Sequence, residues 1–450
     1  MDSELDEGTV LLKTPKGTRD LNPNEVKLRE DLINTIKYYF ELYGGNPIDT
    51  PVIECLDTVK NLYGEEFKKL VYTLDDFGGE KLLLRYDLTV PFSRYVVNNA
   101  INNFKRYQIG KVYRRDEPQI SKGRYREFYQ ADFDIIGTDN KSMFQDTEII
   151  LLISDILNSV LGENTFKIII NSRSLLFDVL KFIGIQDEEF NTVCSSLDKL
   201  DKQSQEDIKN ELLNDKKIDT GLVEKINDYM NLIIELNQMD ITKNAKLNIL
   251  REKNYISTET YDNINLFFNN IDAVGANGNI FFNPLLSRGL DYYTGIIYEA
   301  EYLDKEIMSS SIAAGGRYDN MLNKLGNRGV IPAIGVSIGV ERIVTILEKK
   351  NMYKNINKKT VYVATIGENM ETHKLVLINE LRKQNIDVDY SYYNLKMRQQ
   401  FDHVFKKGIK YMIILGESEV KSNTLKLKFI DEHKETTIAR NDILRYVSGN

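Results

Sequence analysis

The feature that most constrains the fold is a ten-residue segment whose side chains alternate between two chemically different faces. The odd positions from 127 to 135 are mainly apolar, whereas the even positions from 126 to 134 carry Arg126, Phe128, Gln130, Asp132 and Asp134. A period of two is the period of a β-strand, in which successive side chains point to opposite sides. The segment therefore predicts a strand with one mainly apolar face and one mainly polar face.

Two neighbouring segments extend this pattern. In LLLRYDLTV, residues 82–90, Arg85, Asp87 and Thr89 alternate with apolar or aromatic side chains. Eight Lys or Arg residues stand between positions 105 and 127, against three acidic ones. A solvated polar face is the commoner explanation of a single alternating strand. Two such strands, with a ring among the charges, favour a binding face, because arginine forks suit a triphosphate and an aromatic face suits a base.

Cysteine and histidine are too scarce for several classes of site. The chain has two cysteines and three histidines, and these are Cys55, Cys194, His373, His403 and His433. We therefore expect no zinc site built on Cys and His ligands and no disulfide framework. The first 372 residues contain no histidine for a Ser-His-Asp triad, and no GxxxxGK(S/T) phosphate loop occurs. An enzyme site there must use arginine, carboxylates, tyrosine and metal brought by the substrate.

Length and composition predict a cytosolic globular protein of about three domains. The 450 residues are 42% hydrophobic and 28% charged, with a net charge of -8. No stretch approaches the ~18 to 20 apolar residues that cross a membrane, and the start MDSELDEG lacks a targeting pattern. We expect no membrane partner.

The hydrophobic pattern divides the rest of the chain into segments. The expected elements are a helix near 28–40, strands and loops over 47–137, a helix over 142–161, a strand over 166–171 and Gly-rich strands from 271 to a final helix before 350. Between them, residues 186–270 are polar, with Val223, Ile226, Met230 and Ile233 at helical steps. This spacing predicts a mostly helical insertion.

Residues 358–450 read as a separate unit after a polar linker at 351–357. Short strands alternate there with helices near 370–384 and 397–407, which predicts a small α/β domain with a largely parallel sheet. The unit has 16 Lys and Arg against 12 Asp and Glu, whereas the other 357 residues have 43 against 55. A basic module on an acidic body suits a polyanionic partner, although an ordinary solvated surface can carry the same excess.

Three further peptides place reactive side chains between glycines. They are SRGLDYYTG, with Arg288, Asp291, Tyr292 and Tyr293; GGRYD, from Gly315 to Asp319; and GVSIGVER, which ends in Arg342. Each peptide alone is about as typical of a tight turn or of close packing as of a site.

Taken in this order, the peptides resemble those of a known family, the histidyl-tRNA synthetases among the class II aminoacyl-tRNA synthetases, in their eukaryotic-like form. VYRRDEPQISKGRYREFYQADFDIIG is similar to motif 2 of that class, GVSIGVERI to motif 3 and IDTPVIE to the weakly defined motif 1. SRGLDYYTG and AAGGRYD resemble the two signature peptides of the histidine enzymes. The resemblance covers nearly the whole chain.

The resemblance implies an α+β catalytic domain built on an antiparallel sheet, with a helical insertion and a C-terminal α/β anticodon-binding domain. The implied ranges are 1–185 and 271–350 for the catalytic domain, 186–270 for the insertion, 351–357 for the linker and 358–450 for the anticodon-binding domain. Motif 1 would lie near 47–58, motif 2 near 105–137 and motif 3 near 330–346. The insertion could clamp the acceptor arm of tRNA or be a solvated helical bundle.

The resemblance also implies a reaction. Histidine and ATP would give histidyl-adenylate and pyrophosphate, and histidine would then pass to the 3′ end of tRNA(His). The implied catalytic residues are Arg114 and Arg288. The implied ATP-binding residues are Arg114, Arg126, Phe128, Arg288 and Arg342, and the implied histidine-binding residues are Asp87, Thr89, Arg114, Gln130, Asp134, Arg288, Tyr292 and Tyr293.

Partners and an alternative complete these expectations. ATP would enter with Mg²⁺, without zinc or an organic cofactor, and the motif 1 region would make a homodimer.

Asp87 and Asp134 stand where bacterial members carry Glu, so their contacts must be made from a shorter side chain. The alternative is a non-catalytic, histidyl synthetase-like regulatory or sensor protein, which the presence of Arg114, Arg288 and Arg342 disfavours.

Overall fold

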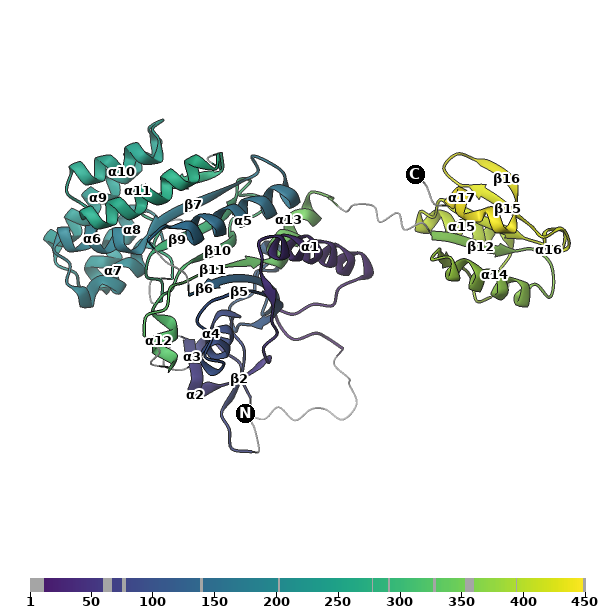
Figure 1. Ribbon diagram of the computed structural model, residues 1–450, viewed down its shortest axis with the longest axis horizontal. Coiled ribbons are helices and arrows are strands. Elements are labelled where there is room, and N and C mark those ends of the chain that lie inside the picture. Colours follow the sequence, from purple (N-terminus) through teal and green to yellow (C-terminus); the bar gives the residue numbers. More distant parts are fainter. Residues whose placement is uncertain are drawn as a thin grey trace. The chain divides into compact units, whose positions relative to one another are not determined.

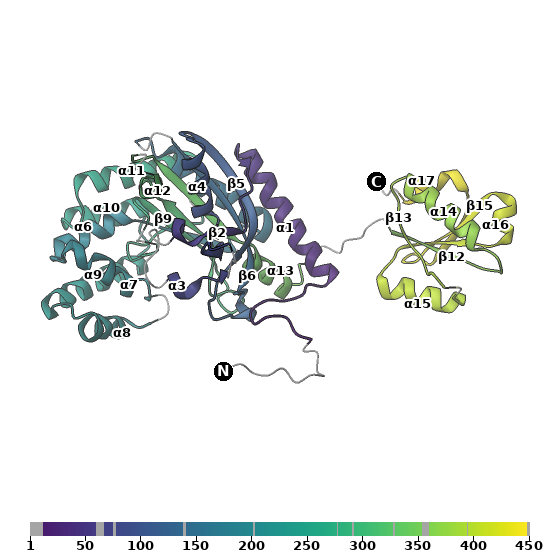
Figure 2. The same ribbon diagram turned by 90° about the horizontal axis from the view of Figure 1, so that it is seen from below.

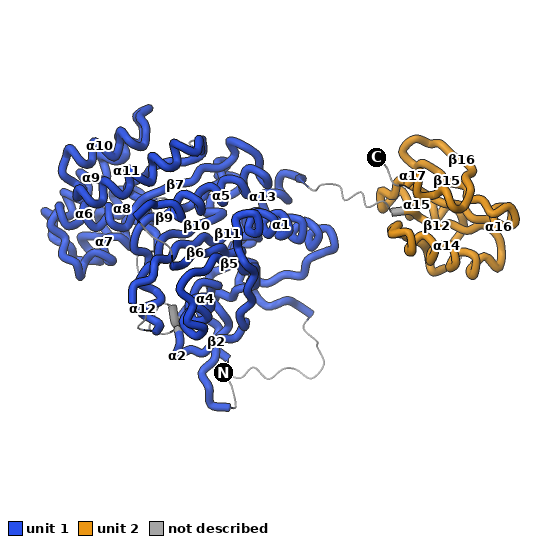
Figure 3. The backbone as a smooth tube through the Cα atoms, in the orientation of Figure 1, with its two compact units in different colours: residues 1–352 blue, residues 353–450 orange. Residues whose placement is uncertain are grey.

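The computed structural model divides the chain into two compact units, residues 1–352 and 353–450 (Figure 3). The described residues are 12–59, 67–74, 78–137, 141–200, 203–276, 278–289, 292–326, 329–352, 360–393 and 395–447. Among these residues, no helix is long and apolar enough to span a bilayer. The expected linker at 351–357 falls largely outside the described residues.

An eight-stranded sheet organises the first unit. In spatial order its strands are β1 (Asn46–Pro47), β5 (Phe104–Tyr113), β6 (Glu127–Ile136), β11 (Ala333–Gly339), β10 (Ser311–Arg317), β9 (Ile296–Tyr302), β7 (Phe166–Ser172) and β8 (Ile280–Phe282). All neighbours are antiparallel except the two edge pairs, β1 with β5 and β7 with β8. The predicted antiparallel catalytic sheet is therefore confirmed.

The register of the central strands decides which side chains meet. Asp134 of β6 lies opposite Arg106 of β5 and opposite Gly335 of β11. Asp132, two positions earlier, lies opposite Gln108 and Ser337. Because directly opposed residues share a face of a sheet, the alternation of β6 assembles a polar surface from three strands.

Three helices cover the apolar face of this sheet. They are α1 (Pro23–Leu42), α5 (Phe144–Leu161) and α13 (Val340–Lys349), which contact one another or the central strands (Figure 1). The α1 helix begins at a capping box between Asn22 and Glu25, and its buried stripe follows the predicted periodicity. Its Phe40 ring lies 5.4 Å from the ring of Phe133 on the apolar side of β6. The predicted helix near 28–40 is confirmed.

The segment LLLRYDLTV differs from its prediction. Only Leu82–Leu84 form a strand, β4, which joins β2 (Ile53–Cys55) and β3 (Thr73–Leu74) in a three-stranded sheet. Helix α4 (Thr89–Asn98) follows, and Asp87 Oδ1 accepts a hydrogen bond from the Val90 amide in its first turn. The expectation of one strand face with Arg85, Asp87 and Thr89 is therefore wrong, because a carboxylate at a helix start can satisfy free amides there. Two short helices, α2 (Leu56–Val59) and α3 (Phe67–Leu70), also interrupt the expected strands.

Helices account for the polar middle of the chain. The described helices there are α6 (Arg173–Ile183), α7 (Phe190–Leu197), α8 (Gln205–Asn210), a π turn (Glu211–Asp215), α9 (Thr220–Gln238), α10 (Lys243–Glu252) and α11 (Thr258–Ala273). The predicted stripe is buried in α9. These helices gather near the β7–β8 end of the sheet, and their buried residues continue its core (Figure 2). A short helix, α12 (Met321–Gly326), packs on α4. Whether 186–270 forms a domain of its own stays a prediction.

The second unit is an α/β domain with a mixed sheet. Its strand order is β13 (Asp387–Asp389), β12 (Thr360–Thr365), β14 (Tyr411–Leu415), β15 (Thr424–Phe429) and β16 (Lys434–Ala439). The first three strands are parallel, but β15 and β16 add an antiparallel hairpin. The prediction of a largely parallel sheet is therefore correct only for β13, β12 and β14. The connection between β15 and β16 is too short for a parallel crossover, so these two strands pair antiparallel. The helices are α14 (Glu371–Lys383), α15 (Met397–Lys407), α16 (Glu417–Ser422) and α17 (Ile443–Val447).

A buried ion pair joins α5 to the sheet and gives a stability prediction. Arg317 of β10 donates from Nε to Asp146 Oδ1 of α5 at 3.1 Å, and both side chains are at most 5% exposed. Replacing Arg317→Met alone leaves a buried carboxylate without its partner, which costs about 3 to 5 kcal/mol. Hydrogen exchange of the α5 and β10 amides in the intact chain measures this loss. Adding Asp146→Leu to Arg317→Met should restore much of it, and a double variant as unstable as the single one would contradict the assignment.

Candidate active site

Arg114 and Phe128 lie side by side at one end of the polar face. Arg114 follows β5, and its Nε donates to the Tyr86 carbonyl oxygen at 3.1 Å. Its guanidinium carbon lies 4.2 Å from the Tyr86 ring centroid and 5.3 Å from that of Phe128. A cation is thus held next to the half-buried ring of Phe128, an arrangement that can bind a phosphate beside an aromatic base.

A serine hydroxyl joins the other two predicted arginines. Arg288 Nη1 lies 2.6 Å from Glu299 Oε2 and 3.2 Å from Ser311 Oγ. Arg342 Nη1 donates to the Ser311 carbonyl oxygen and lies 3.3 Å from its Oγ. Burial, followed by the positive charges of Arg288 and Arg114, lowers the pKa of Arg342 to about 10. The three arginines therefore form one cluster with excess positive charge, which suits anionic groups.

Arg126, the remaining predicted ATP residue, is held by the N-terminal segment. Its amide donates to the Gly17 carbonyl oxygen at 2.7 Å, and its Nε donates to the Asp116 carbonyl oxygen at 3.1 Å. A Cβ on Gly17 would lie 2.6 Å from Arg126 Cγ, and Gly17 has φ +80°. The segment that precedes α1 therefore packs on this arginine, and only glycine fits that approach without strain.

Carboxylates gather at the other end of the polar face. Arg106 is fully buried there, with Nη2 at 2.6 Å from Asp134 Oδ2 and 4.0 Å from Asp132 Oδ2. It also donates to the Leu88 carbonyl oxygen, and its guanidinium carbon lies 4.4 Å from the Phe92 ring centroid of α4. Asp134 Oδ1 accepts a hydrogen bond from the Tyr318 hydroxyl at 2.5 Å.

Burial controls the charge of these carboxylates. It raises the pKa of Asp132 to about 7, an effect that Arg106 opposes and Asp134 reinforces. Burial also raises the pKa of Asp134, while Arg106 and the Tyr318 hydroxyl oppose the shift. The negative charge of Asp87 raises the pKa of both groups further. Two acidic groups thus share one arginine in a site that disfavours net charge.

Gln130 connects the two ends of the polar face. Its Nε2 donates to Ser337 Oγ at 2.7 Å, across the β6–β11 pair. Thr89, in contrast, starts α4, where its carbonyl oxygen accepts from the Ser93 hydroxyl. The predicted histidine-binding residues therefore come from a strand and from a helix start, not from two strands.

Glycines make room for the predicted tyrosines. The rings of Tyr292 and Tyr293 have centroids 4.3 Å apart, and a Cβ on Gly316 would lie 2.8 Å from the Tyr293 ring. A Cβ on Gly335 would lie 1.9 Å from Asp134 Oδ1. The first three residues of the Gly-Gly-Arg-Tyr-Asp peptide therefore end strand β10 rather than forming a tight turn, with glycine where a ring approaches the backbone. Asp291 falls outside the described residues.

Sequence reasoning did not assign Arg106 or Asp132 to the site. The sequence patterns include both residues. Arg106 is one of the eight basic residues, and Asp132 lies on the polar face of the alternating segment. The missing information was the register that sets Arg106 opposite Asp134, because register depends on partner strands distant in sequence. Ser311 and Glu299 were missed for the same reason.

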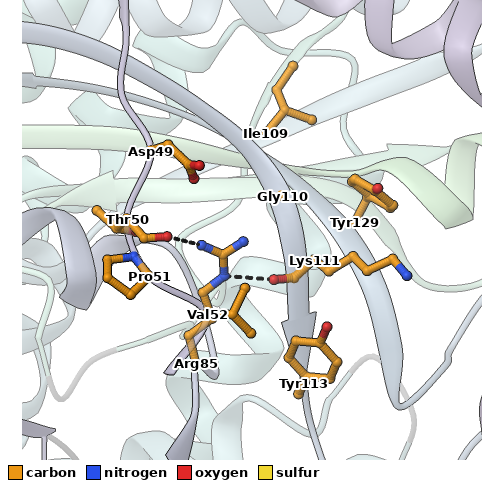
Figure 4. Close-up of a pocket in the computed structure, with 10 residues that line it drawn as sticks. All are labelled: Asp49, Thr50, Pro51, Val52, Arg85, Ile109, Gly110, Lys111, Tyr113 and Tyr129. Carbon is orange, nitrogen blue, oxygen red and sulfur yellow. Dashed lines mark hydrogen bonds between the residues drawn. The ribbon is translucent and has the colours of Figure 1, made fainter. Parts of the chain in front are cut away.

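A hollow of about 630 Å³ lies elsewhere and contains none of the predicted site residues (Figure 4). Arg85 stands in it, donating to the carbonyl oxygens of Thr50 and Lys111 at 2.8 Å each. The remaining lining residues are Asp49, Pro51, Val52, Ile109, Gly110, Tyr113 and Tyr129. Residues 49–52 on its wall lie in the range 47–58 predicted for motif 1, and the hollow shares no lining residue with the arginine cluster.

Metal ligands are sparse in the part of the chain that the structure describes. It contains no group of three or more His, Cys, Asp or Glu side chains placed to hold a metal ion. Cys55 is exposed, and Cys194 is buried, which raises the pKa of its thiol to about 12. The Cys194 thiol is thus not set up as a reactive thiolate.

Comparison with known proteins gives one consistent result. The family model described as histidyl-tRNA synthetase matches residues 17–343, and that described as anticodon binding domain matches 360–450. The cytoplasmic histidine–tRNA ligase of Dictyostelium discoideum is 40% identical over 441 residues, covering 96% of this chain and 90% of that protein. The mitochondrial histidine–tRNA ligase of Bos taurus is 36% identical, covering 96% and 87%.

A solved structure shares the fold. The crystal structure of histidyl-tRNA synthetase from Nostoc sp. PCC 7120 matches with a TM-score of 0.80 at 24% identity, covering 98% of this chain and 99% of that one. At this identity the likeness concerns the arrangement of elements alone. With a family model over most of its length and relatives at 36% to 40% identity, the chain belongs to the histidyl-tRNA synthetase family.

Proposed function

We propose that the chain is a histidine–tRNA ligase that works on the polar face of its eight-stranded sheet. It activates L-histidine with ATP to histidyl-adenylate and pyrophosphate, and then transfers histidine to the 3′ end of tRNA(His). The observation that carries the proposal is the division of this face into an arginine cluster next to Phe128 and a buried carboxylate cluster around Arg106. One half suits a nucleotide, and the other suits a small cationic ligand.

Activation needs little proton chemistry. The histidine carboxylate is already ionised at neutral pH, so it attacks the α-phosphorus of ATP directly. An oxygen–phosphorus bond forms, and the bond to the departing pyrophosphate breaks. Fixed cations then stabilise the negative charge on the phosphoryl oxygens. Such stabilisation is the main way in which enzymes lower the barrier to phosphoryl transfer.

The arginines have distinct proposed roles. Arg114 holds the α-phosphate and the histidine carboxylate, and Arg288 offsets charge at the reacting phosphoryl group. Arg342 binds the far phosphates, Phe128 stacks on adenine and Arg126 supports the ATP end. The lowered pKa of Arg342 supports this division, because three crowded cations gain most from a polyanion. Mg²⁺ enters as part of the ATP substrate, and the Glu299 carboxylate beside Arg288 is a donor of the kind that it prefers.

The carboxylate half reads the amino acid. Asp87, Thr89 and Gln130 surround the α-amino group, Asp134 and Tyr293 meet the imidazole, and Tyr292 lines the pocket. A smaller or apolar side chain would lack the ring nitrogens that Asp134 and Tyr293 meet in this proposal, so it would bury these polar groups without gaining their contacts. Such a loss disfavours the wrong amino acid strongly, so selection needs no editing site.

The second unit supplies the contact to tRNA. The charge excess of +4 in residues 358–450 supports anticodon binding through phosphate contacts and stacking, with salt-dependent affinity. The helices between 186 and 270 clamp the acceptor arm in this proposal. The regulatory alternative has no observation in its favour, since Arg288 and Arg342 meet at one serine and the charge of Arg114 acts on Arg342.

We further propose a cytosolic homodimer in contact through the motif 1 region. Val52 and Ile53 are 38% and 47% exposed next to the hollow around Arg85. Apolar side chains on the rim of a hollow suit burial against a second copy.

The activation step gives the first test of function. The purified chain should exchange labelled pyrophosphate into ATP when histidine is present and not with other amino acids. Arg288→Ala should slow this exchange by about 10²- to 10³-fold, because a fixed transition-state charge is removed. Arg251→Ala, which removes a cation on α10 stacked on Tyr261, is the matched control and should leave the rate unchanged. Full exchange in Arg288→Ala, with histidine as the only active amino acid, would remove Arg288 from the chemistry.

The dimer has a separate test. Light scattering should give a mass of about twice the 52.0 kDa of one chain. Ile53→Asp should shift the protein toward monomer, because the interface would bury an unpaired carboxylate. Leu303→Asp, at a comparably exposed position (48%) on another part of the unit, should remain dimeric. A monomeric wild-type chain would refute the dimer.

A further inference from the structure

Asp132 is a buried acidic group that the proposed mechanism does not use. It lies between Gln130 and Asp134 on the polar face of β6, so two predicted histidine-binding residues flank it. Its side chain is 2% exposed. A carboxylate in such a place needs a partner, because burial of an unpaired charge is costly.

The neighbours of Asp132 do not supply enough positive charge. Arg106 is 4.0 Å from Asp132 but 2.6 Å from Asp134, so its guanidinium mainly serves the second carboxylate. Within the described part of the chain, Asp132 Oδ1, Asp134 Oδ2 and Gln130 Oε1 have no hydrogen-bond partner, and neither do Arg106 Nε and Nη1. Asp132 is hydrogen-bonded to the Ser337 hydroxyl, which carries no charge. The cluster therefore keeps acceptor oxygens that a ligand can meet.

Other charged groups around Asp132 do not change this balance. The groups that act on it from the surrounding elements are Arg106 on β5, Asp134 on β6, Ser337 on β11, Asp87 before α4, Tyr318 after β10 and Arg85 after β4. Among the charged ones, the two carboxylates of Asp132 and Asp134 share the adjacent Arg106, and Arg85 is engaged with two carbonyl oxygens. A positive ligand would correct the excess.

We propose that Asp132 is a further binding carboxylate of the histidine pocket, which releases its proton when the α-ammonium group of histidine enters. This inference rests on the proposed function and deepens it, because it adds a residue and a proton to the binding step. The proton passes from the Asp132 carboxyl to solvent, and the resulting carboxylate pairs with the ammonium group. The α-ammonium is the appropriate cation, because it is charged at neutral pH whereas most free imidazole is not.

The direction in which the affinity for histidine changes with pH follows from the titration of the Asp132 carboxyl group. In the free chain, burial holds the pKa of Asp132 near 7, so the group is about half protonated at pH 7. A cation beside it favours the charged form and lowers that pKa. Histidine should therefore bind more tightly as pH rises through about 7, and binding at pH 7 should release up to about half a proton from this group.

Calorimetric titration of the full-length chain with L-histidine, in buffers of different ionisation enthalpy, counts this proton. Asp132→Asn is nearly isosteric and should release correspondingly fewer protons at pH 7. Its affinity for histidine should fall about 10- to 100-fold at pH 8, as expected for loss of a bond to a charged group. Asp402→Asn, at an exposed position in the second unit, is the control and should match the wild type.

A second arm needs no variant. 3-(Imidazol-4-yl)propionate lacks the α-ammonium group, so its binding to the wild-type chain should not release the Asp132 proton. Equal proton counts for the wild type and Asp132→Asn would overturn the inference, as would equal release by histidine and by the propionate. A wild-type chain that does not bind histidine would instead contradict the proposed function, so the two failures are distinguishable.

Discussion

The antiparallel register of β5, β6 and β11 is the constraint on which the rest of the site depends. It sets Arg106 and Gly335 against Asp134, and Ser337 against Asp132. A slip by one residue would turn these polar groups into the apolar core under α1 and α5. The same register therefore stabilises the fold and builds the polar face, so the site cannot move without loss of the core.

Two glycines allow the site to be compact. Gly316 lets the Tyr293 ring lie on β10, and Gly335 leaves space for the Asp134 carboxylate on β11. Any larger side chain at these two positions would push the Tyr293 ring or the Asp134 carboxylate away from the sheet. The buried ion pair of Arg106 and Asp134 then fixes the carboxylate, at the expense of leaving Asp132 without a full partner. Charge that the protein leaves uncompensated is available to a ligand.

Much of this architecture could be predicted from local sequence. The strand at 127–136 and the helix at 23–42 follow from periods of two and of about three and a half, which are local properties. Helix α4 could not be predicted in this way, because alternation in LLLRYDLTV imitates a strand while Asp87 starts a helix. The β15–β16 hairpin could not be predicted in this way, because only β15 alternates clearly, with Leu425 and Leu427 buried, whereas β16 buries only Ile438.

The candidate site could be predicted only in part. The arginines were found through peptides that resemble those of a family, and the structure places Arg288 and Arg342 on one serine. Arg106, Asp132, Ser311 and Glu299 could not be assigned, because their meaning depends on which strands pair. Register joins residues that are far apart in the chain, and local sequence does not encode it.

The central claim is that one sheet face binds histidine at its carboxylate half and ATP at its arginine half. A crystal structure of the chain with L-histidine and a non-hydrolysable ATP analogue tests this claim most directly. The account predicts the imidazole within hydrogen-bond distance of Asp134 and Tyr293, and the α-phosphate within reach of Arg114 and Arg288. Either ligand in the hollow around Arg85, with the polar face empty, would contradict it.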